Sequence, residues 1–158
     1  MTPLAPEERL ALEDVAADLG TKPKWLWQLI SFESGWDPQV KNPGSSARGL
    51  IQFMNSTARE LGYLDSAGLV RSNPTREKQL RGPVLDYLRR YAPYGTEQSL
   101  YMAVFYPAAR HWDQEREFPP EVQEANPGIR TVRDYVEHVQ RRAGAYEESE
   151  GTSGIKED

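Results

Sequence analysis

Cysteine is absent from the 158-residue sequence, and histidine occurs only as His111 and His138. A chain without cysteine can form neither a disulfide bond nor a thiolate nucleophile, and it can bind no metal through sulfur. Two histidines, with no acidic cluster at metal-ligand spacing, are too few for a zinc site. The sequence therefore predicts no metal and no cofactor, and we expect His138 to lie on the solvated face of a helix.

An excess of positive charge is also lacking, since 19 Lys and Arg stand against 24 Asp and Glu, for a formal net charge of -5. Nucleic-acid-binding domains normally carry a basic surface, so we expect no nucleic-acid partner. The same balance predicts no long-range attraction to an anionic membrane or wall polymer. Binding to such a polymer must then depend on short-range, local contacts.

Long apolar runs are missing as well. No stretch approaches the roughly 20 apolar residues that a membrane span needs. The opening stretch, MTPLAPEERLALEDVAADLG, has neither the basic start nor the apolar run of a secretory signal. We therefore expect no membrane span and no export signal, so that activity outside the cytoplasm implies either another route of delivery or a sequence that is a mature fragment.

The sequence does contain apolar spacing typical of short helices, cut by 12 glycines and 12 prolines. We predict one mainly helical domain over residues 1–146, followed by a disordered polar tail over residues 147–158. Residues 62–74 and 118–128 are interpreted as connectors, and residues 39–48 have room for a small β-hairpin at most. The expected helices begin near Pro6, Pro23, Thr57, Thr75, Thr96 and Thr131, with a break at Gly82-Pro83.

One carboxylate stands out because it shares a helical face with apolar residues. In the stretch LISFESGWDP, Glu33 falls on the face of Leu26 and Ile30, in the last turn of the expected helix. Burial and the negative end of the helix dipole both disfavour an ionised carboxylate, so we predict a raised pKa for Glu33. A raised carboxyl pKa is what a general acid needs near neutral pH. The alternative is a partly exposed glutamate that only borders the apolar stripe.

A second carboxylate for glycosidase chemistry is not evident near Glu33, although glycosidases usually use two. Asp37 is the nearest in sequence, but Pro38 follows it and biases it away from helical backbone. We therefore expect Asp37 to cap the loop. Asp65 and Asp86 stay open as distant partners.

The segment ARGLIQFMNSTARELG contains a polar side chain in apolar company, since Gln52 is flanked by Leu50, Ile51, Phe53 and Met54. An amide among such neighbours must find hydrogen bonds. They come either from the protein itself or from a polar ligand such as a sugar.

Four segments occur in the order ESGWDP, GLIQFMNSTARELG, LYMAVFYPAA and TVRDYVEHV. Together they resemble the lytic transglycosylase domain of the soluble, lysozyme-like (SLT) kind, over about residues 19–139. The resemblance is greatest to the versions in bacteriophage tail or lysis proteins. It implies a mainly helical, lysozyme-like fold with a cleft for peptidoglycan glycan strands, and virion or tail proteins as further partners.

The resemblance also implies roles for individual residues. Glu33 matches the single catalytic acid of the family, and Ser34 matches the small residue after it. Gln52 and Met54 match positions that line the cleft. Tyr135 matches the tyrosine whose hydroxyl approaches the catalytic carboxyl.

Two further matches are less direct. Asn42 falls where many members have a serine that contacts the acetamido group of the substrate, with a loop that differs in length by one residue. Many members read Ala-Tyr-Asn-Ala-Gly where this chain has Ala-Val-Phe-Tyr-Pro-Ala over residues 103–108. The resemblance therefore leaves open whether Phe105 or Tyr106 takes the aromatic place.

By resemblance, Glu33 protonates the glycosidic oxygen between N-acetylmuramic acid and N-acetylglucosamine and then accepts the proton of the C6 hydroxyl, which closes a 1,6-anhydro ring. Attack by water, as in a goose-type muramidase, is the alternative reaction. A non-catalytic, peptidoglycan-binding virion component is the alternative from another class. In each case the chain would act on the bacterial cell wall and reach it as part of a virion or by another release system.

Overall fold

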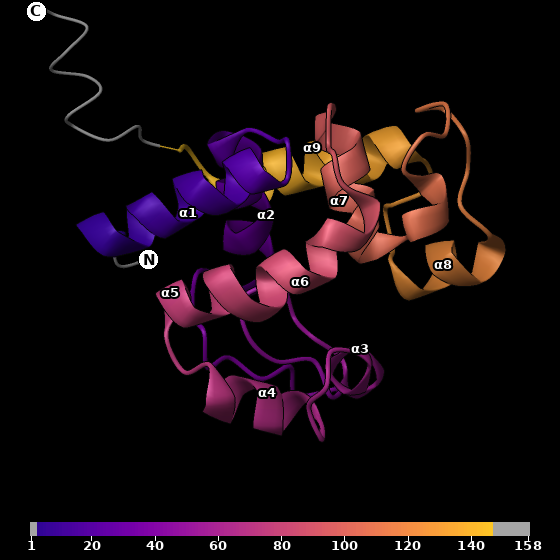
Figure 1. The fold of residues 1–158 in the computed structure, drawn as a ribbon. Coiled ribbons are helices and arrows are strands. Elements are labelled where there is room, and N and C mark those ends of the chain that lie inside the picture. The colour runs from indigo at the N-terminus through magenta and orange to yellow at the C-terminus, as the bar shows by residue number, and fades with distance from the viewer. Residues whose placement is uncertain (1–2, 147–158) are drawn as a thin grey trace, which may run out of the picture.

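A computed structural model describes residues 3–146, and the tail predicted for residues 147–158 lies outside the described residues. The described chain is mainly helical, as the sequence predicts (Figure 1). None of its helices is long and apolar enough to cross a membrane. The α-helices are α1 (Pro6–Asp18), α2 (Pro23–Ser34), α3 (Asn55–Glu60), α4 (Ser66–Ser72), α5 (Arg76–Gln79), α6 (Leu85–Leu88), α7 (Glu97–Phe105), α8 (Pro120–Ala125) and α9 (Val132–Ala143).

The limits of α2 follow from its sequence. Pro23 occupies the first helical turn, where its missing N–H leaves no bond unmade. Gly35 ends the helix with φ of +61°, a left-handed conformation that glycine adopts without a steric cost, and its N–H donates to the Ser31 carbonyl at 2.9 Å. These two ends place Glu33 in the last turn of α2.

The predicted helix from Thr75 to about Tyr91 is broken, as expected, at Gly82-Pro83. Thr75 caps α5 by accepting a hydrogen bond from the Lys78 N–H. A π-helical turn over Leu80–Val84 joins α5 to α6, and Gly82 has non-helical φ and ψ of -100° and -106°. The pieces run end to end across the middle of Figure 1, with α1 alongside α5.

Some local predictions were wrong. Residues 62–74 are not all loop, because Asp65 accepts a hydrogen bond from the Gly68 N–H and so caps α4. The connector at residues 118–128 contains α8, with Pro120 in its first turn. The helix expected to begin at Thr57 begins at Asn55, so Thr57 lies inside α3 and caps nothing.

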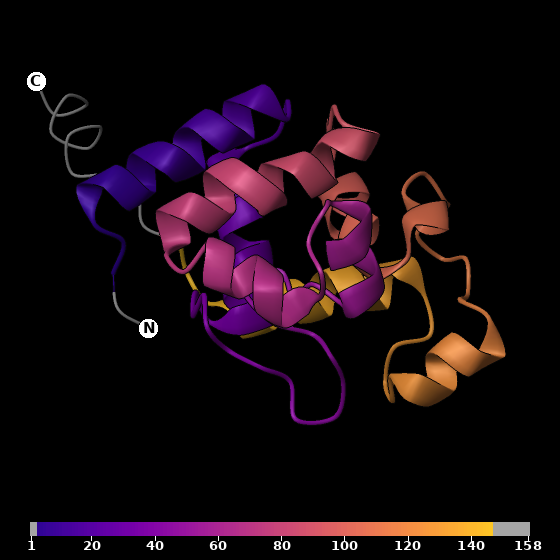
Figure 2. The ribbon, with the colours of Figure 1, turned by 60° about the horizontal axis from the view of Figure 1, so that its bottom comes forward.

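The predicted β-hairpin near residues 39–48 is reduced to isolated antiparallel bridges between Lys41 and Arg48 and between Arg48 and Phe53. The Asn42 N–H donates to the Ala47 carbonyl at 2.9 Å, but the chain turns away before regular strands can form. Together with α3 and α4, this segment forms the lower part of the molecule in Figure 1, whereas α8 lies at the end opposite α1 in both Figure 1 and Figure 2.

The core is centred on α7, which was expected to be buried on every face. Residues 98–103 of α7 are all buried, and α2 and α9 both pack against α7 and against each other. α9 begins, as predicted, at the Thr131 cap, which forms a capping box with Asp134, and it buries Val132, Val136 and Val139.

A buried glutamine ties the loop before α3 to the region around α5. Gln79 is fully buried; its Nε2 donates to the Pro38 carbonyl at 2.7 Å and the Asn73 carbonyl at 2.9 Å. Its Oε1 accepts from the Leu50 N–H at 2.9 Å. Gly49 passes so close that an added Cβ would lie 2.8 Å from this oxygen. One side chain thus satisfies three backbone groups of three separate segments.

Candidate active site

Glu33 lines a pocket of about 310 Å³ between the end of α2, the end of α7, and α9. We call it the Glu33 pocket. The segment between α8 and α9 forms its remaining wall. Besides Glu33, its lining consists of Phe32, Phe105, Ala125, Asn126, Pro127, Ile129, Tyr135 and His138. A carboxyl group therefore lies at the end of a helix within a largely apolar and aromatic enclosure.

Burial raises the pKa of Glu33 from the ordinary value of 4.5 to about 7. The cause is desolvation, because the charged form of this partly buried residue loses much of its water shell and gains no compensating cation in the pocket. The predicted upward shift of the pKa is thereby confirmed. Such a group is protonated in a large fraction of molecules near neutral pH and can donate a proton.

No second carboxylate lines the Glu33 pocket among the described residues. Asp37 is exposed, and its Oδ1 accepts from the Gln39 N–H at 2.8 Å, which is the loop-capping role predicted for it. Asp65 caps α4. Asp86 lies on α6, 3.9 Å from Arg89 across an exposed ion pair. The candidate partners from the sequence are thus occupied elsewhere.

Tyr135 projects from α9 into the Glu33 pocket and is 4% exposed. Its ring stacks on Phe105, with centroids 4.0 Å apart and planes inclined by 19°, and meets Phe32 edge-on at 5.9 Å. Burial, and then the nearby charge of Glu33, raise the pKa of Tyr135 well above its ordinary range. The hydroxyl therefore stays protonated, as a hydrogen-bond donor needs to be.

Of the two aromatic residues that the sequence left open, Phe105 lies in the Glu33 pocket. Tyr106 does not line this pocket, and its ring packs 5.7 Å from Trp112 and 5.8 Å from Phe118. The helix α7 ends at Phe105, so the next residue leaves the helical path. Both rings contact Phe118, but only Phe105 also stacks on Tyr135 in the Glu33 pocket.

Gln52 and Met54 line a different and smaller pocket of about 70 Å³, together with Val104 and Tyr87. Val104 directly precedes Phe105, so the two pockets flank the end of α7. Gln52 has φ of +59°, and its amide donates to the Gly49 carbonyl at 3.0 Å. The protein therefore supplies part of the hydrogen bonding of this amide.

Ser34 and Asn42 are outside both pockets. The Ser34 hydroxyl donates to the Ile30 carbonyl at 3.1 Å, within its own helix. The Asn42 side-chain Oδ1 accepts from the Gly44 N–H at 2.7 Å in an exposed turn. The structure brings Glu33, Phe105 and Tyr135 together in one pocket, whose lining includes neither Ser34 nor Asn42.

His138 is a residue of the Glu33 pocket that the sequence analysis missed. Its ring is partly buried and meets Phe32 edge-on at 5.3 Å, so the prediction of a solvated side chain was wrong. The signal was its spacing, because His138 follows Tyr135 by three residues and hence shares its face of α9. Asn126 comes from the connector after α8, for which the sequence offered no signal.

The raised pKa of Glu33 predicts how stability depends on pH. Below pH 4.5 the carboxyl is protonated in both folded and unfolded chains; between 4.5 and about 7 only the unfolded chain releases the proton. Stability should therefore fall as pH rises, by on the order of 3 kcal/mol in total at about 1.4 kcal/mol per pKa unit. Glu33→Gln has no carboxyl proton to release, so its stability should not fall in this way. Urea unfolding at about pH 4 and about pH 8.5 should show that the free energy of unfolding of the variant, relative to the wild type, is higher at about pH 8.5. An equal difference at both pH values would contradict the buried carboxyl.

Comparison with known proteins places part of the chain in a family context. No curated protein matches the sequence. Residues 13–82 match the family model described as the transglycosylase SLT domain, a stretch that includes α2 with Glu33 and the segment with Gln52 and Met54. The mainly helical structure is consistent with the lysozyme-like fold of that family. This match covers less than half of the chain, and it supports a glycan-cleaving domain of the transglycosylase type with peptidoglycan as its substrate class.

Proposed function

We propose that the protein is a peptidoglycan lytic transglycosylase in which Glu33 is the only general acid and base. The observation that carries this proposal is the isolation of Glu33: its pKa is about 7, and no second carboxylate lines its pocket in the described part of the chain. The SLT match over residues 13–82 supports the substrate class. An enzyme with a nucleophilic or base carboxylate would need a partner within about 5 to 10 Å.

The proposed reaction uses Glu33 twice. Protonated Glu33 gives its proton to the oxygen of the β-1,4 bond between N-acetylmuramic acid and N-acetylglucosamine, and the bond from that oxygen to C1 breaks. The acetamido group of the substrate stabilises the developing cation at C1. The C6 hydroxyl oxygen then bonds to C1 while its proton passes to the Glu33 carboxylate, which restores the enzyme and leaves a 1,6-anhydro end.

Product masses test the proposal and separate it from hydrolysis. Digestion of purified peptidoglycan should yield anhydro ends, lighter than reducing ends by the mass of one water molecule. Reducing ends would instead establish a muramidase. Binding without any product in a wall-turbidity assay would establish the non-catalytic alternative, which the changed residues 103–108 favour.

We further propose that Gln52 and Met54 contact the glycan beyond the Glu33 pocket, since their pocket lies on the other side of Val104 and Phe105. Ser34 and Asn42 are proposed only as outer contacts, because their polar groups bond to neighbouring backbone. Delivery as a bacteriophage tail or lysis component is proposed from the resemblance alone. Detection of the chain in purified virions by mass spectrometry would test it.

Tyr135→Phe should lower turnover by about tenfold or more, because a bond that the hydroxyl donates to the Glu33 carboxylate only once the acid has given up its proton would contribute roughly 1.5 to 3 kcal/mol. The ring, with its stacking on Phe105, is kept, so the free energy of unfolding should change by less than about 0.5 kcal/mol. Parallel measurement of turnover and urea unfolding checks both parts. A large loss of stability with unchanged turnover would assign Tyr135 a structural role.

Activity should also decline as pH rises through about 7, because the protonated donor form of Glu33 disappears. The sign follows from its role: a residue that acts first as an acid is needed in its protonated state. Initial rates of wall clearing across pH would show the decline. A rate that climbs steadily into the alkaline range would contradict the assignment of Glu33 as the proton donor.

A further inference from the structure

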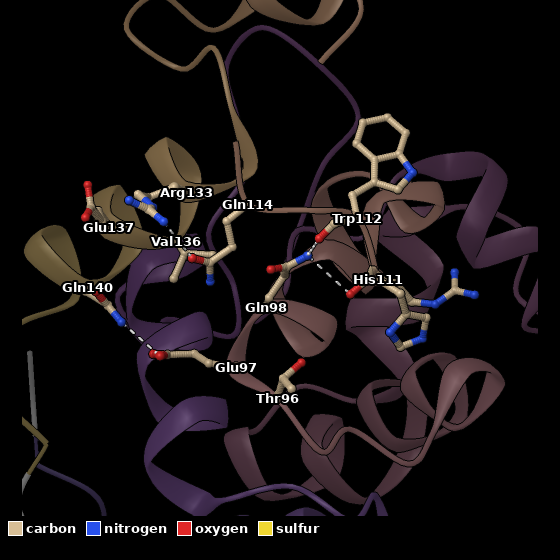
Figure 3. A pocket seen from close by; sticks show the side chains of 11 residues that line it. Thr96, Glu97, Gln98, His111, Trp112, Gln114, Arg133, Val136, Glu137 and Gln140 are labelled. Atoms are coloured by element: carbon tan, nitrogen blue, oxygen red, sulfur yellow. Dashed lines mark hydrogen bonds between the residues drawn. The ribbon is translucent and has the colours of Figure 1, made fainter. Parts of the chain in front are cut away.

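A larger and more polar pocket, of about 520 Å³, lies between the start of α7, the segment after α7, and α9 (Figure 3). We call it the polar pocket. Its polar α9 side chains, Arg133, Glu137 and Gln140, recur at helical spacing on one face of the helix, beside Val136. Tyr135 and His138, which line the Glu33 pocket, fall on the opposite face. The polar pocket is therefore separate from the proposed catalytic site and uses different side chains.

The first acceptor in the polar pocket is the Glu97 carboxylate. Tyr101 Oη and Gln140 Nε2 each donate to it at 2.8 Å, and the second of these bonds is drawn in Figure 3. Tyr101 Oη is in turn 3.0 Å from Gln28 Oε1, so the carboxylate is held by a network that joins α2, α7 and α9. No cation of the described chain forms an ion pair with Glu97. A fixed negative charge thus remains without a countercharge.

The second acceptor is the side-chain oxygen of Gln98, which is 9% exposed. Its Nε2 donates to the carbonyls of Ala109 at 3.2 Å, Arg110 at 3.5 Å and Trp112 at 2.8 Å. These bonds fix the orientation of the amide, because only its nitrogen can donate. Figure 3 shows the oxygen turned the other way, toward Gln114 and α9, and no residue of the described chain donates to it. The amide oxygen of a largely buried residue therefore faces the polar pocket as a free acceptor.

The polar pocket also has a cationic side. Arg110 lines it, with its guanidinium 4.0 Å from the centroid of the Tyr91 ring and one N–H donated to the Pro107 carbonyl. Within the part of the chain that the structure describes, no carboxylate pairs with Arg110. Glu137, an exposed residue of the pocket lining, also forms no ion pair with any described residue. The pocket therefore combines unpaired negative and positive groups in one hollow.

We propose that the polar pocket binds a ligand that carries both a primary ammonium group and a carboxylate, such as an amino acid or a short peptide. An ammonium group has three donors, and Glu97, Gln98 and Glu137 supply acceptors for them. Arg110 pairs with the carboxylate of the ligand. Where the proposed function holds, the natural source of this ligand is the peptide attached to the glycan strands. Such a local site lets a chain with net charge -5 hold an anionic wall through short-range contacts.

The probe for this site is the tripeptide L-Lys-D-Ala-D-Ala, with its Nα,Nε-diacetyl form as the control without ammonium groups. Titrated into the full chain and followed by amide and indole NMR signals, the free peptide should shift the Gln98 side chain and the Trp112 indole, while the diacetyl peptide should bind at least about tenfold more weakly. Glu97→Gln should weaken the free peptide about tenfold. Glu137→Gln, which alters an exposed residue and leaves the Tyr101 network intact, should weaken it about threefold.

Similar affinity for both peptides, unchanged affinity in both variants, or largest shifts at Phe32 and His138 would overturn the proposal. Glu33→Gln separates this site from the proposed function. The variant should bind the free peptide like the wild type even where it cleaves no glycan. If catalysis fails while peptide binding persists, only the function of the Glu33 pocket is wrong; if binding fails in an active enzyme, only the polar pocket is wrong.

Discussion

Replacing Glu33 by glutamine should reduce glycan-strand cleavage at least about a thousandfold, because general acid and general base catalysis each contribute about 10²- to 10⁴-fold and both rest on this one side chain. Glutamine has nearly the same shape and can occupy the same place among Phe32, Phe105 and Tyr135. The folded structure should therefore be retained. Release of soluble fragments from purified peptidoglycan, measured together with circular dichroism, checks both expectations.

The matched control for this experiment is Asp37→Asn, four residues further along. Asp37 is an exposed carboxylate that bonds to the Gln39 N–H, and it lies outside the Glu33 pocket. This substitution should change cleavage by less than about threefold. Near-normal activity of Glu33→Gln, or a comparable loss in both variants, would refute the single-carboxylate mechanism.

The second large effect concerns stability, since Gln79→Leu should destabilise the fold by about 3 to 5 kcal/mol. Leucine fills a similar volume, but it leaves the Pro38 and Asn73 carbonyls and the Leu50 N–H without their partner. Each buried group that loses its hydrogen bond costs about 1 to 3 kcal/mol. Such a loss is a large share of the 5 to 15 kcal/mol that stabilises a typical domain.

Urea unfolding of Gln79→Leu and of Gln39→Leu gives a direct comparison. Gln39 Nε2 also donates to a carbonyl in the same region, that of Pro74 at 2.8 Å, but Gln39 is exposed. Water can replace its bond, so Gln39→Leu should cost less than about 1 kcal/mol. If both variants lose the same small amount of unfolding free energy, the hydrogen bonds of the buried Gln79 amide do not stabilise the loop.

The parts of the site that the sequence predicted are those fixed by helical period. Glu33 could be placed at the end of an apolar stripe because Pro23 and Gly35 bound its helix, and the raised pKa follows from that position. The same period placed Val132, Val136 and Val139 on the inner face of α9. Helix limits and helical spacing therefore suffice to predict the face of the helix on which a side chain lies.

What the sequence could not predict depends on contacts between distant segments. The wall of the Glu33 pocket near Asn126 and Pro127 comes from a connector whose course is fixed only when α8 docks. His138 was misjudged because the polar face of its helix is covered at that point by Phe32 of α2. The choice between Phe105 and Tyr106 likewise required the end of α7, which periodicity alone sets only to within a residue or two.

The helix α9 has three rows of side chains, and each row faces a different part of the molecule. Val132, Val136 and Val139 anchor it to the rest of the molecule, and the stripes on either side of these valines turn Tyr135 toward one hollow and Glu137 toward another. Substitutions confined to the row of Tyr135 or to the row of Glu137 can therefore alter one pocket and leave the other unchanged. A substitution that changes the volume of one of these valines would shift α9 as a rigid unit, and both pockets would then change shape together.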